Sequence, residues 1–159
     1  MSVVWQDCGE TQSGSHALQN TNETYVAVAG GTDVNGEPLY VGRGQHENGE
    51  WIPGKIPRSH NGCYISYGGN EIMCHNCQVL TVSESTRNRL QWIPASNGQI
   101  PHGAIPGGTA SDGATYYIGR AEHEGRLTPG KVHVHNQCLF LPFDGSEHQY
   151  SNYEVLCAQ

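Results

Sequence analysis

Residues 30–55 read GGTDVNGEPLYVGRGQHENGEWIPGK, and residues 107–131 read GGTASDGATYYIGRAEHEGRLTPGK. The two stretches align with one residue fewer in the second, so that Arg43 corresponds to Arg120 and Lys55 to Lys131. A self-match of this length at a nearly constant spacing is typical of a tandem repeat. We therefore predict that the chain contains two copies of one structural unit.

The match continues downstream, where Cys63 corresponds to Cys138. We assign the first repeat to residues 1–82, a linker to residues 83–90 and the second repeat to residues 91–159. Two copies are fewer than an open solenoid usually needs. We therefore expect the repeats to pack with pseudo-two-fold symmetry into one compact unit.

Short segments rich in β-branched and aromatic residues alternate with turn dipeptides, a pattern that favours an all-β fold of antiparallel strands and hairpins. The expected strands are residues 25–29, 39–41, 63–67, 78–82, 116–118, 131–135, 138–143 and 154–157. The expected turns tolerate positive φ at both central positions. They are Asn35-Gly36, Asn48-Gly49, Asn61-Gly62, Asp112-Gly113 and Asp144-Gly145. Residues 83–90 are the only segment whose pattern suits a short helical turn.

The net charge of the chain indicates which kinds of partner it can bind. The formal net charge is −7, from 15 acidic and 8 basic side chains, whereas nucleic-acid binding depends on clustered Lys and Arg. No apolar run approaches the roughly 18 residues of a membrane-crossing helix, and the N-terminus lacks the features of a signal peptide. We expect a soluble protein that binds no nucleic acid, does not insert into membranes, and is cytoplasmic or secreted without a visible signal peptide.

Both copies carry GG-T, then G-R-x-x-H, then P-G-K, and close on a short apolar strand. This combined pattern resembles the DM-nine (DM9) repeat family. The resemblance implies an all-β lectin that recognises mannose or mannose-rich glycans on microbial or cell surfaces, for pattern recognition or innate defence. It also implies pairing of subunits as a homodimer. No cofactor is expected.

The resemblance further implies that sugar contact depends on the Asp of the first turn and on the Lys after the Pro, which are Asp33 and Lys55. In the second copy Lys131 is retained, but Ala110 replaces the acid and the nearest carboxylate is Asp112. A carboxylate accepts hydrogen bonds and an ammonium donates them, which suits the vicinal hydroxyls of a sugar. We expect a site at the first pair and a weaker one at the second.

Structural roles compete with these assignments. Asp33 beside glycine can cap its own turn, and Lys55 can form an ion pair within the repeat. Trp51, close before Lys55, is a candidate for stacking on a sugar ring, although a contact at the rim or in the dimer is an equal alternative.

Two further residue types recur at matching positions. We expect the repeated arginines to pair with a repeated carboxylate such as Glu71 or Glu147 rather than to bind sugar. The repeated histidines are expected to be hydrogen-bonded sheet residues rather than metal ligands or pH sensors. These residues are Arg43 and Arg120, and His46 and His123.

Six cysteines neither demand nor exclude a disulfide framework. Cys74 and Cys77 have the spacing of half a zinc site, but the sequence offers no second half, so no metal is predicted. Cys8 and Cys157 are candidates for a bridge that the sequence alone does not decide.

Two other function classes are open. The chain could be a repeat module of a pore-forming or other defence protein, or a glycan hydrolase that uses carboxylates such as Asp33, Glu71 or Glu147. No nucleophile elbow, triad motif or phosphate loop is visible. We therefore predict a binding protein with no catalytic residues rather than an enzyme.

Overall fold

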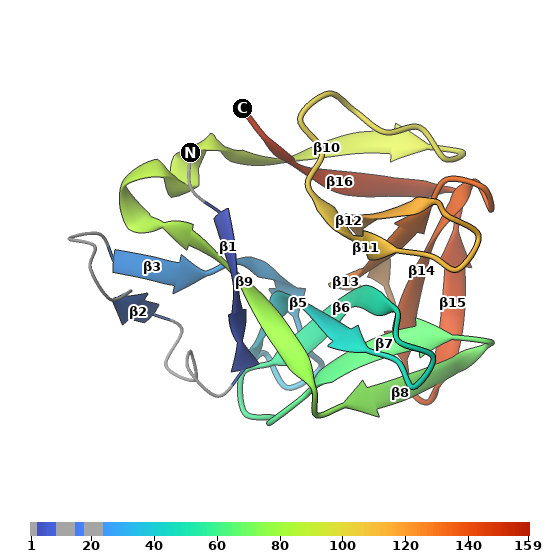
Figure 1. The fold of residues 1–159 in the computed structure, drawn as a ribbon, viewed down its shortest axis with the longest axis horizontal. Helices are drawn as coiled ribbons and strands as arrows, with labels where there is room; N and C mark the ends of the chain where they lie inside the picture. Colours follow the sequence, from blue (N-terminus) through green and yellow to red (C-terminus); the bar gives the residue numbers. More distant parts are fainter. Residues whose placement is uncertain (1–2, 9–14, 18–23) are drawn as a thin grey trace.

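The computed structural model describes residues 3–8, 15–17 and 24–159, and strands make up most of this part of the chain (Figure 1). Among the described strands, every pairing is antiparallel. The prediction of an all-β, two-repeat unit is confirmed. The strands of the first half are β1 (Val3–Asp7), β2 (Ser15–Ala17), β3 (Thr24–Ala27), β4 (Ala29–Thr32), β5 (Pro38–Gln45), β6 (Trp51–Pro57), β7 (Cys63–Tyr67), β8 (Asn70–Cys74) and β9 (Cys77–Ser83). The 3-10 helix η2 (Glu84–Arg89) leads to β10 (Leu90–Ser96), β11 (Pro106–Thr109), β12 (Thr115–His123), β13 (Arg126–His133), β14 (Cys138–Phe143), β15 (Ser146–Tyr150) and β16 (Asn152–Ala158).

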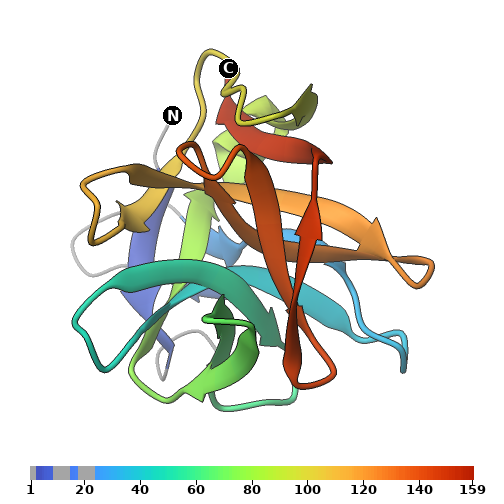
Figure 2. The same cartoon turned by 90° about the vertical axis from the view of Figure 1, so that its right-hand side faces the viewer.

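The two halves repeat the same strand pairing. In the first half β5 pairs with β4, β6 and β9, and in the second half β12 pairs with β11, β13 and β16. A further strand lies on the outer side of each, since β1 places Trp5 opposite Leu80 of β9 and β10 places Trp92 opposite Leu156 of β16. Figures 1 and 2 show the halves, coloured blue to green and yellow to red, lying beside each other and meeting at the centre of the molecule.

One apolar core is shared by the repeats. Its central cluster joins Val41 and Leu80 of the first half to Ile118 and Leu156 of the second, all 0 or 1% exposed. These four residues are equivalent in pairs, so the cluster lies where the halves meet. Burial of such side chains stabilises the folded state by roughly 1.5–3 kcal/mol each.

Paired glycines let the halves approach backbone to backbone. A Cβ added at Gly31 would lie 1.8 Å from the carbonyl oxygen of Leu127, and one added at Gly108 would lie 1.9 Å from that of Trp51. Neither glycine has a positive φ, so close contact rather than backbone conformation requires glycine here. The repeated GG motif thus allows β4 to pack closely against β13, and β11 to pack closely against β6.

The repeated arginines add hydrogen bonds across the same contact between the repeats. Nη1 of Arg43 donates to the carbonyl oxygen of Gly107 at 3.3 Å, and Nη1 of Arg120 donates to that of Gly30 at 3.1 Å. Each guanidinium also lies over a tryptophan ring of its own half. The distances to the ring centroids are 4.3 Å for Arg43 over Trp5 and 4.2 Å for Arg120 over Trp92.

The prediction that these arginines pair with a repeated carboxylate such as Glu71 or Glu147 is wrong. Nε of Arg43 donates to Gln78 at 2.9 Å, and Nε of Arg120 donates to Glu154 at 2.8 Å. The partners lie on β9 and β16 because those strands pair directly with β5 and β12. Glu71 and Glu147 have other partners, described below.

The disulfide also differs from the candidate pairing. Cys8 is bonded to Cys77, while Cys157 is a buried free thiol. The reason is strand placement, because β1 runs beside β9, whereas Cys157 packs into a separate apolar cluster of the second half.

The tight turns are more varied than expected. Both central residues have positive φ at Asp144-Gly145, as in a two-residue hairpin. At three of the other dipeptides only the glycine has positive φ, because these loops are longer, as between β4 and β5. These are Asn35-Gly36, Asn48-Gly49 and Asp112-Gly113, whereas Asn61-Gly62 has no positive φ at all. Within the described residues, no helix has the length and apolar character needed to cross a membrane.

We predict that Gly31→Ala and Gly108→Ala each lower the free energy of unfolding by about 3 kcal/mol, because the added methyl group meets backbone that cannot move aside. Urea unfolding followed by tryptophan fluorescence measures this. Thr32→Ala, at the exposed neighbouring position, is the control and is expected to change stability by less than about 0.5 kcal/mol. Equal stability of the glycine variants and this control would contradict the packing role.

Candidate functional site

Two cavities lie at equivalent places where the repeats meet. The first pocket, of about 480 Å³, is lined by Asp33, Lys55, Tyr64 and Glu71 from the first repeat and by Glu124, Phe143 and Asp144 from the second. The second pocket, of about 350 Å³, is lined by Asp112, Lys131, Phe140 and Glu147 from the second repeat and by Tyr67 from the first. Each cavity is therefore a composite of both repeats.

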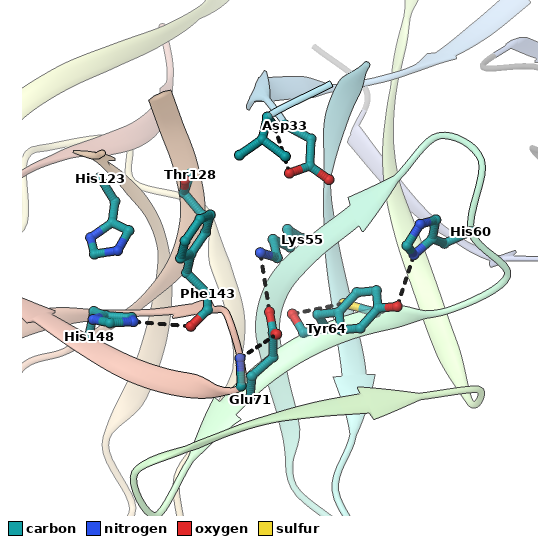
Figure 3. Close-up of polar contacts among 12 residues, drawn as sticks. Asp33, Lys55, His60, Tyr64, Glu71, His123, Thr128, Phe143 and His148 are labelled. Atoms are coloured by element: carbon teal, nitrogen blue, oxygen red, sulfur yellow. Dashed lines mark hydrogen bonds and ion pairs between the residues drawn. The ribbon is translucent and has the colours of Figure 1, made fainter. Parts of the chain in front are cut away.

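Lys55 stands at the base of the first pocket. It lies in the middle of β6, which pairs with β5 and β7, and its side chain is 8% exposed. Its Nζ is 3.2 Å from the carboxylate of Glu71, and it lies 5.3 Å from the ring centroid of Phe143. Figure 3 shows the ammonium between Asp33 and Glu71, with the Phe143 ring to one side.

Asp33 reaches the same cavity from the turn after β4. Its Oδ1 accepts a hydrogen bond from the backbone N–H of Val34 at 2.8 Å, so it caps its own turn. The ion-pair partner of Lys55 is Glu71 and not Asp33. The structure thus brings Asp33 and Lys55 into one pocket without a direct ion pair between them.

The carboxylates give the first pocket a negative field. Burial, followed by the charges of Glu71 and Asp33, raises the pKa of Tyr64. The Tyr64 hydroxyl is hydrogen-bonded to Nδ1 of His60 at 2.9 Å. A ligand in this pocket therefore meets carboxylate acceptors and an ammonium donor beside aromatic rings.

The lysine of the second pocket is more tightly held. Nζ of Lys131 donates to the carbonyl oxygen of Ser66 at 2.6 Å and lies 3.3 Å from the carboxylate of Glu147. Burial lowers the pKa of Lys131, and the charge of Glu147 opposes this shift. Three rings surround the ammonium, with centroids 5.1, 5.4 and 5.5 Å away; they belong to Tyr67, Tyr116 and Phe140.

Asp112 lines the second pocket, but its oxygens are occupied. Oδ1 accepts from the N–H of Ala114 at 2.9 Å, while Oδ2 lies 3.0 Å from Nδ1 of His135 and 3.2 Å from Nε2 of His133. The hydrogen bond from Ala114, followed by that from His135, lowers the pKa of Asp112. Asp112 and Lys131 therefore share a cavity but have less capacity for a ligand than Asp33 and Lys55.

The sequence reasoning allowed Lys55 an ion pair within the repeat, but it did not identify Glu71 and Glu147 as the partners of the two lysines, and it missed the second role of these glutamates. Oε1 of Glu71 accepts from the N–H of Gly145 at 3.1 Å, and Oε1 of Glu147 accepts from the N–H of Gly69 at 3.1 Å. Each glutamate thus joins the lysine of its own repeat to the hairpin tip of the other. The sequence did contain a signal for these pairs, because the lysine and the glutamate recur at the same spacing in both copies.

Trp51 is not among the residues that line either pocket in the described part of the chain. Its ring lies 5.2 Å from the guanidinium of Arg43, and its carbonyl oxygen faces Gly108 at the contact between the repeats. Among residues 3–8, 15–17 and 24–159, no group of three or more His, Cys, Asp or Glu side chains is arranged to hold a metal ion.

These features define a duplicated antiparallel β protein with a buried lysine–glutamate pair in each of two inter-repeat pockets. The family model for the DM9 repeat matches residues 10–74 and 33–150. The chain belongs to the DM9 repeat family.

Natterin-3 from Thalassophryne nattereri is 33% identical over 94 residues, which are 59% of this chain and 23% of natterin-3. The crystal structure of the nematode sperm cell motility protein MFP2B has a similar fold, with a TM-score of 0.62 and 17% sequence identity. That similarity covers 99% of this chain and 46% of the MFP2B chain. The chain therefore spans less than half the length of either protein.

We predict that Glu147→Gln lowers the free energy of unfolding by about 3 kcal/mol, because it leaves the buried Lys131 charge without its partner. Guanidinium unfolding measures the loss. Glu154→Gln is the matched control, since the Arg120–Glu154 pair is more exposed and is expected to contribute about 1 kcal/mol or less. A Glu147→Gln loss no larger than that of the control would show that the buried pair does not stabilise the fold.

Proposed function

We propose that this protein is a lectin that binds mannose or mannose-rich glycans in the first pocket, through Asp33 and Lys55. The observation that carries the proposal is that these two residues, far apart in sequence, line one cavity of about 480 Å³ together with aromatic side chains. Small-ligand sites are commonly concave and partly aromatic, with a few polar groups that fix orientation.

The polar groups suit vicinal hydroxyls. Lys55 has three N–H donors, and within the described part of the chain its ion-pair partner is Glu71, so donors are left for a sugar hydroxyl. Asp33 has one oxygen capping its turn and retains acceptor capacity. Hydrogen bonds to charged groups are roughly twice as strong as neutral ones, which offsets the loss of water from the sugar.

Selectivity follows from the fixed positions of donor and acceptor. A hydroxyl with the wrong axial or equatorial orientation leaves a desolvated group without a partner, which costs about 1–3 kcal/mol. Mannose is therefore expected to bind more tightly than galactose.

Binding is favoured over catalysis by the state of the carboxylates. A glycoside hydrolase needs two carboxyl groups free to act on opposite sides of a glycosidic bond. Glu71 and Glu147 each bind a lysine and a backbone N–H of the opposite hairpin, so both carboxylates already have structural partners.

A repeat module within a larger pore-forming or other defence protein is the second candidate function. The match to natterin-3, of which this chain covers 23%, supports a module role. Release of dye from lipid vesicles tests this candidate, whereas a lectin acting alone is expected to cause no leakage.

Pairing of subunits would raise the strength of binding to clustered glycans. We expect a homodimer, in which two sites act together on mannan by raising the effective concentration of the second contact. The Cys8–Cys77 disulfide supports secretion, because such bonds persist mainly in oxidising compartments.

We predict that Asp33→Ala and Lys55→Ala each weaken binding of methyl α-mannoside at least about tenfold, which corresponds to about 1.4 kcal/mol, whereas Lys131→Ala has a smaller effect. Isothermal titration calorimetry measures the affinities, and circular dichroism melting checks that each variant is folded. Lys55→Met is a second variant that keeps the apolar stem and removes the charge.

Wild-type affinity for mannoside in both Asp33→Ala and Lys55→Met would contradict the assignment of the site. Titration with mannan separates the dimer effect from the intrinsic affinity. Equal constants for mannan and the monosaccharide would contradict the avidity proposed for the dimer.

A further inference from the structure

Phe143 is the aromatic residue that the second repeat contributes to the first pocket, beside Glu124 and Asp144. It ends β14, and its ring lines the cavity 5.3 Å from Nζ of Lys55. The hairpin that follows is held in place because the N–H of Gly145 donates to Glu71. The ring is therefore fixed relative to Lys55 by the same glutamate that pairs with the lysine.

Two histidines support this ring from the side away from Lys55 (Figure 3). The imidazole of His123 packs edge-on against Phe143 with centroids 4.8 Å apart, and Nε2 of His148 is hydrogen-bonded to the Phe143 carbonyl oxygen at 3.0 Å. The two imidazoles also lie against each other at 4.2 Å. His123 is the histidine that recurs in the G-R-x-x-H motif.

The surroundings of His123 favour its neutral form. Burial, followed by the nearby His148, lowers its pKa, although the charge of Glu124 opposes this. Its Nδ1 is hydrogen-bonded to the Tyr150 hydroxyl, which sets the orientation of the imidazole.

The first repeat has the corresponding arrangement. The imidazole of His46 lies against the ring of Tyr67, with centroids 4.2 Å apart, and Tyr67 lines the second pocket 5.1 Å from Nζ of Lys131. In both copies, the motif histidine therefore contacts an aromatic ring of its own repeat, and that ring faces the lysine of the other repeat.

A flat apolar ring beside a donor–acceptor pair matches the chemistry of a pyranose. One side of a sugar ring carries C–H groups that pack on an aromatic face, while its hydroxyls reach polar groups at the edge. An acyclic polyol offers the same hydroxyls without a rigid C–H face. The position of the aromatic ring therefore selects closed sugar rings.

We propose that Phe143 is the stacking surface for a pyranose bound at Asp33 and Lys55, and that His123 is a positioning residue that fixes this surface. The proposal rests on the proposed lectin function and adds the class of ligand, a closed hexose ring, and the residues that select it. It also assigns a role to the repeated histidine. The second repeat then determines the ring selectivity of the site in the first.

The experiment compares four single variants, Phe143→Leu, His123→Gln, His123→Phe and His46→Gln, by calorimetric titration with methyl α-mannoside. Phe143→Leu and His123→Gln are expected to weaken binding about three- to tenfold, as loss of an aromatic contact does. His123→Phe keeps a ring against Phe143 and is expected to restore most of the affinity. His46→Gln is the matched control, because it changes the same motif position at the second pocket and is expected to leave binding unchanged.

Mannitol, an acyclic polyol, is the second probe. It is expected to bind more weakly than methyl α-mannoside, and to have the same affinity for the wild type and for Phe143→Leu. Melting temperatures identify any variant that fails to fold. If His123→Gln does not fold, the affinities of Phe143→Leu and His123→Phe for methyl α-mannoside test the inference instead. Wild-type affinity in Phe143→Leu and His123→Gln, with binding still lost in Lys55→Met, would overturn this inference and leave the proposed function intact. Absence of mannoside binding in the wild type would overturn both.

Discussion

The close approach of two backbones, permitted by a pair of glycines in each repeat, is the constraint on which the structure depends. Gly31 and Gly108 leave no room for a Cβ against Leu127 and Trp51. With this contact made twice, β4 lies on β13 and β11 lies on β6. The side chains of Val41 and Ile118 can then enter one shared core cluster, which neither repeat encloses alone.

The same contact places the pocket residues. Gly30 faces Pro129 and Gly107 faces Pro53, and each of these prolines stands two residues before a pocket lysine in the P-G-K motif. The lysine is thus held in a buried strand whose position is set by the other repeat. The hairpin tips complete the arrangement, since Glu71 and Glu147 each bind backbone across the boundary.

Sequence reasoning succeeded where the signal was local or repeated. The all-β fold and the two copies followed from turn dipeptides and from the self-match. Strand β6 was missed because its sequence, WIPGKIP, contains two prolines and a glycine, which ordinarily argue against a central strand. Here the glycine faces backbone of β7 within contact distance, so packing overrides local propensity.

The contacts across the repeat boundary were beyond the sequence. Nothing local shows that Phe143 faces Lys55, because this contact depends on how the halves pack against each other. Within the first repeat, the Cys8–Cys77 bond depends in the same way on the pairing of β1 with β9. The structure places Asp33 and Lys55 in one cavity, while their contact with sugar stays a prediction. It also separates Trp51 from that cavity, since the start of β6 serves the repeat contact instead.

The composite pockets constrain how such a duplicated gene can diverge. Because Phe143 and Tyr67 each belong to one copy and line the cavity of the other, a substitution in either ring changes the wall of the neighbouring copy's cavity. The loop that carries Asp33 in one copy and Ala110 in the other lines the cavity of its own copy. A substitution in that loop therefore changes a cavity from within its own copy, whereas a substitution of Phe143 or Tyr67 changes the cavity of the other copy.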